Sequence, residues 1–402
     1  MSGAPARGRL RAVLFRAHWM LGISAGLVLA IVGASGAALA FEDEIVAALN
    51  PAHRLVPEGE RLGPDALVAN VRAAHPDFEV RGIAIPLAAP APAEVRVARA
   101  GERGGVAIAV DPWRGTVLGE PVGASLLHIV EMLHRNLLAA EAGKRLVGAS
   151  VVALVVMLVT GLVLRWPWRA RSPRAWLVPD ARLRGRGRWF NLHAVLATWM
   201  LPLYLVSALT GLWWSYAFYR NAINTLAGLP PQPPRPAAAA APPPVTVPPL
   251  DRAWRTFLDE APDATHVVVS FGPDPAAPLD WRYLARNALH ARAFDTLKID
   301  PASGAVVARD AYATQPRGRR FVSAILPLHT GAYFGWPGRL AMATAALAMP
   351  FFAATGLWLW VLRRRMRAVA HGSSYPSRNS KSAATTACET LVVDAVNSAS
   401  PP

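Results

Sequence analysis

Four apolar stretches constrain the fold of this 402-residue chain more than any other feature of its sequence. They cover residues 19–41, 146–164, 194–219 and 340–362, and none contains an Asp, Glu, Lys or Arg in its interior. A helix of about 20 apolar residues is long enough to cross the hydrocarbon core of a bilayer. A content of 53% hydrophobic and 17% charged residues is also typical of a membrane protein. The sequence therefore predicts a membrane α-helical bundle of four transmembrane helices in a lipid bilayer.

The arginines predict the orientation of the four helices. They are concentrated in residues 7–16, 165–188 and 363–367, beside the apolar stretches. Because basic residues are retained in the cytoplasm, we expect both termini there and the long segments 42–127 and 220–327 outside it. The same clustering attributes the net charge of +16 to membrane topology and predicts no nucleic-acid partner. The first stretch exceeds the ~7–15 residues of a signal-peptide core, so we expect it to be retained.

The two halves of the chain repeat one pattern of His and Gly. A His lies 17 residues before a Ser-Gly or Thr-Gly pair in the first and third spans, and 26 residues before a Thr-Gly pair around the second and fourth. The matching sets are His18 with Ser35-Gly36, His193 with Thr210-Gly211, His134 with Thr160-Gly161, and His329 with Thr355-Gly356. A Pro/Ala-rich insertion, residues 229–249, accounts for the extra length of the second half and is expected to be an extended linker. Since both copies start on the same side, we expect a tandem parallel repeat related by an axis along the membrane normal.

The repeat divides the chain into membrane and outer segments. Each outer segment begins with a predicted helix (64–74 and 250–260), continues into alternating strands (79–85 and 266–271) and contains an Asp-Pro-x-x-Gly turn (110–117 and 299–306). We therefore expect two small α+β domains outside the membrane. The full division is 1–41, cytoplasmic N-terminus and first span; 42–127, first outer domain; 128–166, amphipathic segment and second span; 167–192, Arg-rich cytoplasmic loop; 193–219, third span; 220–327, second outer domain with the insertion; 328–362, fourth span; and 363–402, a cytoplasmic, disordered tail.

These motifs together resemble the PepSY-associated transmembrane family of bacteria, including its iron-regulated and ferrisiderophore-reductase members. The resemblance covers residues 10–367 and is carried by residues 18–22, Leu133-His134-Arg135, Thr160-Gly161-Leu162, Leu192-His193, Thr210-Gly211, Leu328-His329-Thr330-Gly331, Thr355-Gly356 and the two Asp-Pro-x-x-Gly turns. It implies PepSY-like outer domains, a place in the bacterial inner membrane and, in some members, haem-dependent reduction of ferric siderophores. The chain departs from the family pattern in its long Pro/Ala insertion.

The four repeated histidines are the candidate cofactor ligands. His18 and His193 begin helices that run outward, so both are expected near the cytoplasmic face, while His134 and His329 precede helices that run inward and are expected near the outer face. Axial haem ligands must lie at one depth on different helices, so the sequence predicts two haem b groups, one for each pair. The alternative is that all four histidines are packing residues.

Other residues near these histidines have two possible roles. Arg16, Arg188, Arg135 and Arg339 are placed to pair with haem propionates or to act as interfacial anchors. His128 is a surface residue that could contact the substrate or one of the ligand residues. His134 and His329 precede their apolar cores by 11–12 residues, or roughly 17 Å of straight helix, so we expect the helices either to project outward or to bend at Gly143 and Gly338.

The remaining histidines and the single cysteine limit the other sites that the chain can form. His53, His75, His266 and His290 lie in the outer domains and are expected to contact solvent. Cys388 is the only cysteine, which excludes an internal disulfide, a four-thiolate iron–sulfur cluster, a cysteine zinc site and covalent haem attachment.

Three functions remain open at this point. The first is a transmembrane oxidoreductase that passes electrons to an outer acceptor such as ferric siderophore iron. Since no dinucleotide fingerprint or flavin domain is evident, its donor would be a cytoplasmic protein or a quinol. The second is a membrane-anchored PepSY binding or regulatory module without redox activity. The third, a permease, is weakened by the absence of charges inside the spans and by the small number of helices.

Overall fold

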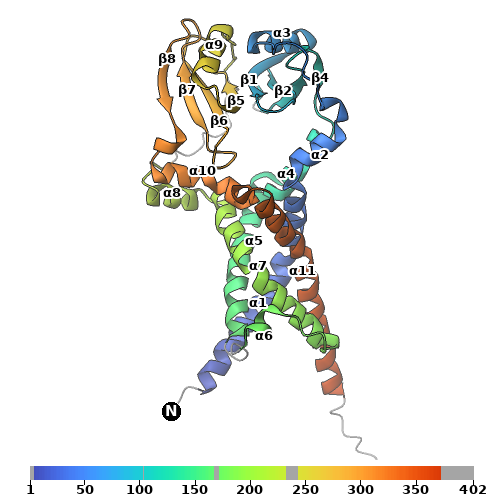
Figure 1. Cartoon of the computed structure of the whole chain (residues 1–402). Helices are drawn as coiled ribbons and strands as arrows, with labels where there is room; N and C mark the ends of the chain where they lie inside the picture. The colour runs from blue at the N-terminus through green and yellow to red at the C-terminus, as the bar shows by residue number, and fades with distance from the viewer. Residues whose placement is uncertain (1–3, 103, 167–171, 232–242, 373–402) are drawn as a thin grey trace, which may run out of the picture.

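The computed structural model describes residues 4–102, 104–166, 172–231 and 243–372 (Figure 1). Four helices are long and apolar enough to cross a membrane, which confirms the predicted spans. They are α1 (Ala4–Leu39), α5 (Ala140–Arg165), α7 (Gly185–Ser215) and α11 (Gly335–Gly372). The third span is shorter than expected at its far end, because α7 stops at Ser215 and the extended backbone of Tyr216 redirects the chain into α8 (Ala217–Leu226).

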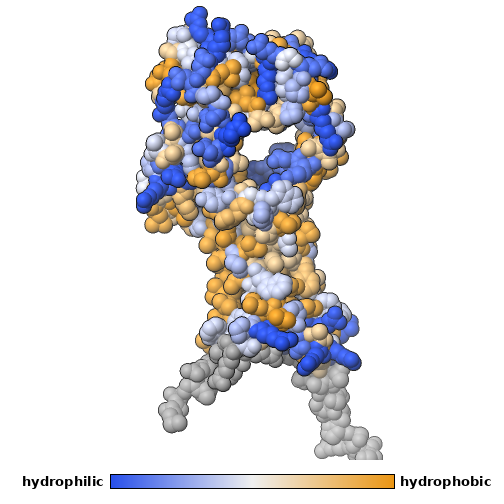
Figure 2. Space-filling model, viewed as in Figure 1, coloured by the Kyte–Doolittle hydropathy of each residue, from blue (hydrophilic) through white to orange (hydrophobic). Residues whose placement is uncertain are grey.

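The four long helices form a bundle in which α1 and α7 face each other across the centre. Helix α1 packs against α5 and α11, and α7 packs against the same two helices. At the α1–α11 crossing Gly33 allows a close approach, since a Cβ there would lie 2.6 Å from the Cβ of Met349. Large apolar side chains such as Leu27 and Leu347 are exposed on the outside, as expected for surfaces that contact lipid. Figure 2 shows this apolar band between two hydrophilic ends.

A single antiparallel sheet of eight strands lies beyond one end of the bundle, which we call the sheet end. Its strands are β1 (Phe78–Pro86), β2 (Ala93–Arg99), β3 (Val106–Val110), β4 (Val117–Gly119), β5 (Ala264–Ser270), β6 (Leu279–Ala285), β7 (Asp295–Ile299) and β8 (Val306–Asp310). The strand order is β4-β3-β2-β1-β5-β6-β7-β8, with Ala84 of β1 opposite Val268 of β5. The two predicted outer domains are therefore joined by main-chain hydrogen bonds into one sheet.

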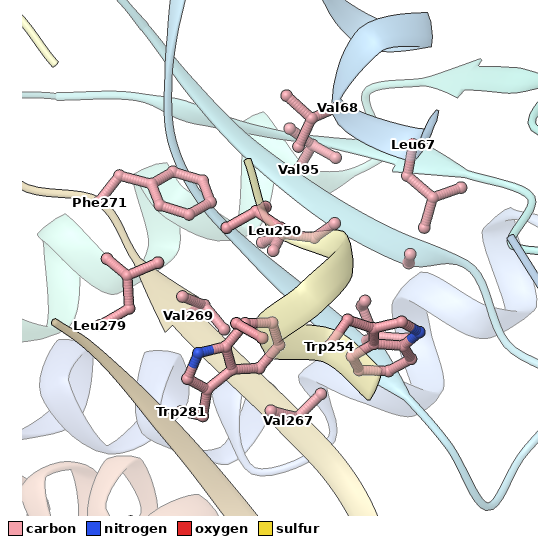
Figure 3. Close-up of a cluster of buried hydrophobic side chains, with 14 of the residues drawn as sticks. Leu67, Val68, Val95, Leu250, Trp254, Val267, Val269, Phe271, Leu279 and Trp281 are labelled. Carbon is pink, nitrogen blue, oxygen red and sulfur yellow. The ribbon is translucent and has the colours of Figure 1, made fainter. Parts of the chain in front are cut away.

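One hydrophobic core serves both halves of this sheet. Helices α3 (Pro64–Ala74) and α9 (Asp251–Glu260) contribute side chains to it together with the strands (Figure 3). Phe257 and Trp281 are fully buried there, which stabilises the fold by on the order of 2–3 kcal/mol for each side chain. The Asp65 carboxylate of α3 accepts the backbone N–H groups of Leu250 and Asp251, so one half of the domain caps the first turn of α9 in the other.

The Asp-Pro-x-x-Gly turns form as predicted. Asp111 Oδ1 accepts the backbone N–H of Trp113 at 2.8 Å, and Asp300 Oδ1 accepts that of Ser303 at 2.7 Å. Gly115 and Gly304 have φ values of +72° and +75°, a conformation that an L-residue adopts only with strain. These turns connect β3 to β4 and β7 to β8.

Short helices connect the sheet to the bundle. These are α2 (Glu42–Leu49), η1 (Pro51–His53), α4 (Ala124–Asn136), α10 (Arg317–Thr330), η2 (Tyr312–Thr314) and η3 (Ala332–Phe334), while α6 (Pro173–Leu177) lies at the opposite end. Helices α4 and α10 lie at the mouth of the bundle (Figure 1). Figure 2 shows an opening between this mouth and the sheet domain.

The bends that place α4 and α10 differ from those expected. The chain turns at Leu137, Leu138 and Ala140, whose φ values are positive, and at Gly331 and Gly335, so the breaks precede Gly143 and Gly338. These two glycines instead allow close packing of the corner, because a Cβ at either would overlap a carbonyl oxygen, that of Asn136 or that of Gly331. The chain therefore bends after α4 and after α10, and neither helix continues straight into α5 or α11 as an outward projection.

Two predicted features lie largely outside the described residues. The centre of the Pro/Ala-rich insertion falls in residues 232–242, and most of the predicted tail falls in residues 373–402. The first part of that tail, residues 363–372, is not disordered as predicted but continues helix α11. In the described part of the insertion, Val245 and Val247 pack against the hydrophobic core of the sheet domain. The end of the insertion is therefore part of the folded domain.

Candidate functional site

Two of the four candidate histidines meet at the sheet end of the bundle. His134 lies on α4 and His329 on α10, and the centres of their rings are 6.3 Å apart with an angle of 65° between the ring planes. The indole of Trp214, from α7, packs against the His329 ring at 5.4 Å. The bends after α4 and α10 bring this pair together, although their sequence positions are 195 residues apart.

The other two histidines lie toward the opposite end of the bundle, on the two helices that face each other. His18 is on α1 and His193 on α7, and their Nδ1 atoms contact Thr160 of α5 and Thr355 of α11. The ring of Phe352 packs edge-on against His193 at 5.2 Å. Along α1, 17 residues separate His18 from Ser35, which contacts His134. At 1.5 Å a residue, the two histidine levels are about 25 Å apart, slightly less than the hydrocarbon thickness of a bilayer.

Each candidate imidazole is hydrogen-bonded to a hydroxyl of the repeated Ser-Gly and Thr-Gly pairs. The sequence shows both sets of residues but not their pairing, which crosses from one helix to another. The Nδ1 atoms lie 3.0 Å from Thr160 Oγ1 for His18, 2.8 Å from Thr355 Oγ1 for His193, 3.3 Å from Ser35 Oγ for His134, and 2.9 Å from Thr210 Oγ1 for His329. The repeated spacing of His and Thr-Gly was the signal from which this pairing could have been found.

The hydroxyl groups determine which ring nitrogen carries the proton. Each hydroxyl lies 2.6–2.8 Å from the carbonyl four residues earlier in its own helix, so it donates to that carbonyl and accepts from the imidazole. The Nδ1 atoms of His134 and His329 also lie 2.8 Å from Val32 O and 3.1 Å from Ser207 O, which can only accept. All four rings are therefore Nδ1–H tautomers whose Nε2 atom has a free lone pair, and no contact within the described residues occupies that atom.

Glycine follows each hydroxyl residue and lets the imidazole approach the helix. A Cβ on Gly36 would lie 2.8 Å from Cε1 of His134, one on Gly161 would lie 3.1 Å from Cε1 of His18, and one on Gly211 would lie 3.3 Å from Cε1 of His329. Gly356 is different, because a Cβ there would meet nothing within 4 Å. A Cβ on Gly36 would therefore overlap the ring, while one on Gly161 or Gly211 would require the ring to move by a few tenths of an ångström.

Burial favours the neutral imidazole at the sheet end. It lowers the pKa of His134, an effect that outweighs the opposing hydrogen bond to the Val32 carbonyl. Burial and the nearby His134 together lower the pKa of His329 to about 4. Both rings are neutral at physiological pH, and a neutral imidazole is the form that binds a metal ion.

The four arginines and His128, predicted to lie near the histidine pairs, are found in different places. The Arg135 guanidinium donates to Glu131 at 2.8 Å, and the exposed His128 ring lies 3.5 Å from the same carboxylate. Arg339 is paired with Glu44 at 2.6 Å and so connects the start of α11 to α2. Arg16 and Arg188 are exposed near the opposite end of the bundle. Arg339 and Arg135 thus have protein partners, and His128 lies on the surface of α4.

The prediction that His290 is solvated is wrong. Only 5% of this residue is exposed, and its Nε2 lies 2.9 Å from the hydroxyl of Tyr312. The backbone N–H of Arg292 donates to its Nδ1, so Nε2 carries the proton and donates to Tyr312. Burial follows from the folding of the loop after β6 onto η2, which local sequence did not reveal.

The described residues contain no group of three or more His, Cys, Asp or Glu side chains that could hold a metal ion by themselves. Paired imidazoles with free Nε2 atoms are the donor sets that the site offers. Two protein ligands leave most of a metal's coordination positions to another molecule, as in a porphyrin complex.

Comparison with known proteins assigns the chain to a family. The search of curated proteins finds no match. A family model described as the PepSY-associated TM region matches residues 15–363, a range that includes all four spans, the sheet and the four histidines. With its helices, sheet and histidine pairs in place, this multi-pass membrane protein belongs to the PepSY-associated TM region family.

Proposed function

We propose that this protein is a haem-b-containing oxidoreductase of the bacterial inner membrane. It passes electrons from the cytoplasmic side to an acceptor at the sheet end, ferric iron held by a siderophore. The observation that carries this proposal is the set of four imidazoles, each held through Nδ1 by a hydroxyl on another helix and each left with a free Nε2 lone pair.

The residues present fit a bis-imidazole haem. The ring centres of His134 and His329 lie 6.3 Å apart, so the two imidazoles are close enough to bind one metal ion. His134 and His329 would hold one haem, and His18 and His193 the other. The agreement of all four contacts between the two halves supports the tandem repeat that the sequence predicts.

The bound haem iron supplies one-electron oxidation and reduction. The protein residues hold the ligands and set their electronic character. A hydroxyl that accepts from Nδ1–H keeps the ring in one tautomer and orientation and raises the basicity of Nε2. Trp214 and Phe352 pack against His329 and His193 and restrict their rotation.

The orientation follows from the charges of the bundle ends. The arginines at the start of α7 and the end of α11 lie at the end of the bundle opposite the sheet (Figure 1). Retention of basic residues in the cytoplasm then places the sheet domain outside. Reduction of ferric iron there weakens its binding by hard oxygen ligands and releases it for uptake. The electron donor is a cytoplasmic protein or a membrane quinol.

The test is a visible spectrum of the full-length protein, purified in detergent and recorded oxidised and reduced. We expect two b-type signals. His134→Ala and His329→Ala should each remove the same signal, and His18→Ala and His193→Ala should each remove the other. His128→Ala is the matched control, because this exposed residue lies on α4 with His134, and it should retain both signals.

A preparation without haem absorbance would refute the redox proposal. So would a loss of signal that does not follow the two pairs. The protein would then be better described as a membrane-anchored binding module, with the four histidines as packing residues.

A further inference from the structure

A cavity at the sheet end lies along α10, the helix that also carries His329. Its volume is about 430 Å³, within the size range of small-molecule sites. It is lined by one face of α10 and by residues of the neighbouring loops, chiefly Arg317, Arg320, Phe321, Leu328, Tyr312 and Tyr333. Leu328, the residue before His329 in α10, is one of the lining residues.

The cavity is positively charged. Arg317 and Arg320 line it, and neither has a carboxylate partner within the described residues. Arg319, between them, is directed elsewhere and pairs with Asp310 at 3.2 Å. No acidic side chain of the described chain lines the cavity, so an occupant carrying negative charge is favoured. A planar guanidinium binds the oxygen atoms of such an anion through two parallel hydrogen bonds.

Aromatic side chains form the rest of the lining. Phe321 is 51% exposed and Tyr333 is 38% exposed, although both are large side chains. The Arg320 guanidinium lies over the ring of Tyr312 at 5.3 Å. Aromatic rings and guanidinium planes both stack well on a flat ring. These surfaces favour a ligand that is aromatic as well as anionic.

One wall of the cavity is held in place by buried hydrogen bonds. His290 donates to the Tyr312 hydroxyl at 2.9 Å, and that hydroxyl lies 3.3 Å from the carbonyl of Arg320. The ring of Tyr333 also packs against His290 at 5.5 Å. The site is therefore formed before a ligand arrives, which reduces the entropy lost on binding.

We infer that this cavity binds the electron acceptor, and that the acceptor is an anionic chelate in which aryl oxygens hold ferric iron, as in a catecholate complex. This inference rests on the proposed function for the identity of the metal. The negative charge of the ligand is inferred from Arg317 and Arg320, and its flat aromatic rings are inferred from Tyr312, Phe321 and Tyr333. A neutral hydroxamate chelate offers no net charge to Arg317 and Arg320 and is expected to bind more weakly.

The test measures binding without electron transfer. The probes are two gallium(III) complexes, a tris-catecholate and a neutral tris-hydroxamate, because gallium(III) is not reduced under these conditions. Equilibrium dialysis against full-length protein in a neutral detergent gives the affinities. We expect the catecholate complex to bind more tightly, and Arg317→Gln with Arg320→Gln to weaken it at least tenfold. The matched control, Arg319→Gln, should bind as the wild type does.

Further variants distinguish chelate binding at this site from a folding defect and from lipid binding. Arg317→Lys with Arg320→Lys retains the charge and should give an intermediate affinity, which excludes a folding defect as the cause. Equal weakening by Arg319→Gln, or equal affinity for the two complexes, would overturn the inference. So would displacement of the catecholate complex by an anionic phospholipid added to the detergent, which would assign Arg317 and Arg320 to lipid headgroups.

Failure of the proposed function is distinguishable from failure of this site. Gallium binding does not need haem, so His18→Ala protein, which should lack the distant haem, should retain the cavity and its affinity. Protein that shows both haem signals but does not distinguish the two gallium complexes would refute the cavity assignment alone.

Discussion

At the scale of single residues, the candidate site depends on hydroxyl groups that have already donated their hydrogen. A Ser or Thr inside a helix commonly bonds to the carbonyl one turn earlier, which leaves its oxygen as an acceptor. Here Ser35, Thr160, Thr210 and Thr355 all do so, and each accepts from a His on another helix. A hydroxyl side chain that most helices only tolerate thereby determines the tautomer of a candidate ligand.

Gly36→Ala tests the close approach of His134 to α1. The new Cβ would lie 2.8 Å from Cε1 of the ring, so the ring or the helix must shift. We expect a loss of stability on the order of 1–3 kcal/mol and weaker retention of the haem at the sheet end. Gly356→Ala is the matched control, since its Cβ has open space, and it should leave both properties unchanged. Apparent melting temperature and haem content per protein measure the difference, and equal effects in the two variants would contradict the packing argument.

At the scale of elements, corners and loops decide where side chains lie. The positive-φ residues after α4 and α10 turn these helices back over the mouth of the bundle and bring His134 to His329. In the sheet domain, the loop between β6 and β7 is held to η2 by His290 and Tyr312. Each of these elements is short, so its position depends on a few contacts with its neighbours.

The loop contact predicts how stability depends on pH. Burial lowers the pKa of His290 below its ordinary value, so the unfolded chain binds a proton more readily than the folded one. The contribution of His290 is therefore complete above about pH 6.5, the unperturbed value, and decreases as the pH falls below it. Protonation would also put a hydrogen on the Nδ1 atom that accepts from Arg292.

We expect the wild type to melt at a lower temperature at pH 5.5 than at pH 7.5, and His290→Gln to reduce this difference. His266 on β5, whose pKa burial also lowers, should account for part of the remaining slope. Hydrogen–deuterium exchange of peptides from the sheet domain, recorded at increasing temperature, measures the melting of that domain. An unchanged pH dependence in His290→Gln protein would show that this loop contact does not control it.

At the scale of the whole molecule, one end of the bundle carries the sheet and the other carries the arginine-rich segments. The two histidine levels, about 25 Å apart along α1, lie near these two ends. The arginines predict that the sheet lies outside the cytoplasm, in which case this arrangement connects the two sides of the membrane.

Cysteine labelling tests this orientation. Cys388, the natural cysteine in the tail, should react with a membrane-impermeant maleimide only after spheroplasts are permeabilised. In a Cys388→Ser background, Ala100→Cys, at an exposed position after β2, should react in intact spheroplasts. The reverse pattern would show that the sheet domain is cytoplasmic and would reverse the proposed direction of electron transfer.

Much of the fold and part of the candidate site follow from sequence alone. A bilayer requires long uncharged helices, so the four spans can be read directly, and the Asp-Pro-x-x-Gly turns follow from the local conformations of Pro, Asp and Gly. Equal spacing in the two halves identified His18, His134, His193 and His329. These features depend on neighbours in the chain or on the solvent, and both are visible in sequence.

Only the tertiary structure decided which groups meet. Contacts between distant segments joined the two outer units through β1 and β5, turned α4 and α10 at residues other than Gly143 and Gly338, and buried His290. They also paired each candidate His with a hydroxyl on a different helix, since the rotation of one helix against another comes from the packing of whole surfaces. Sequence therefore determined the membrane topology and the candidate ligands, while packing decided their partners and their tautomers.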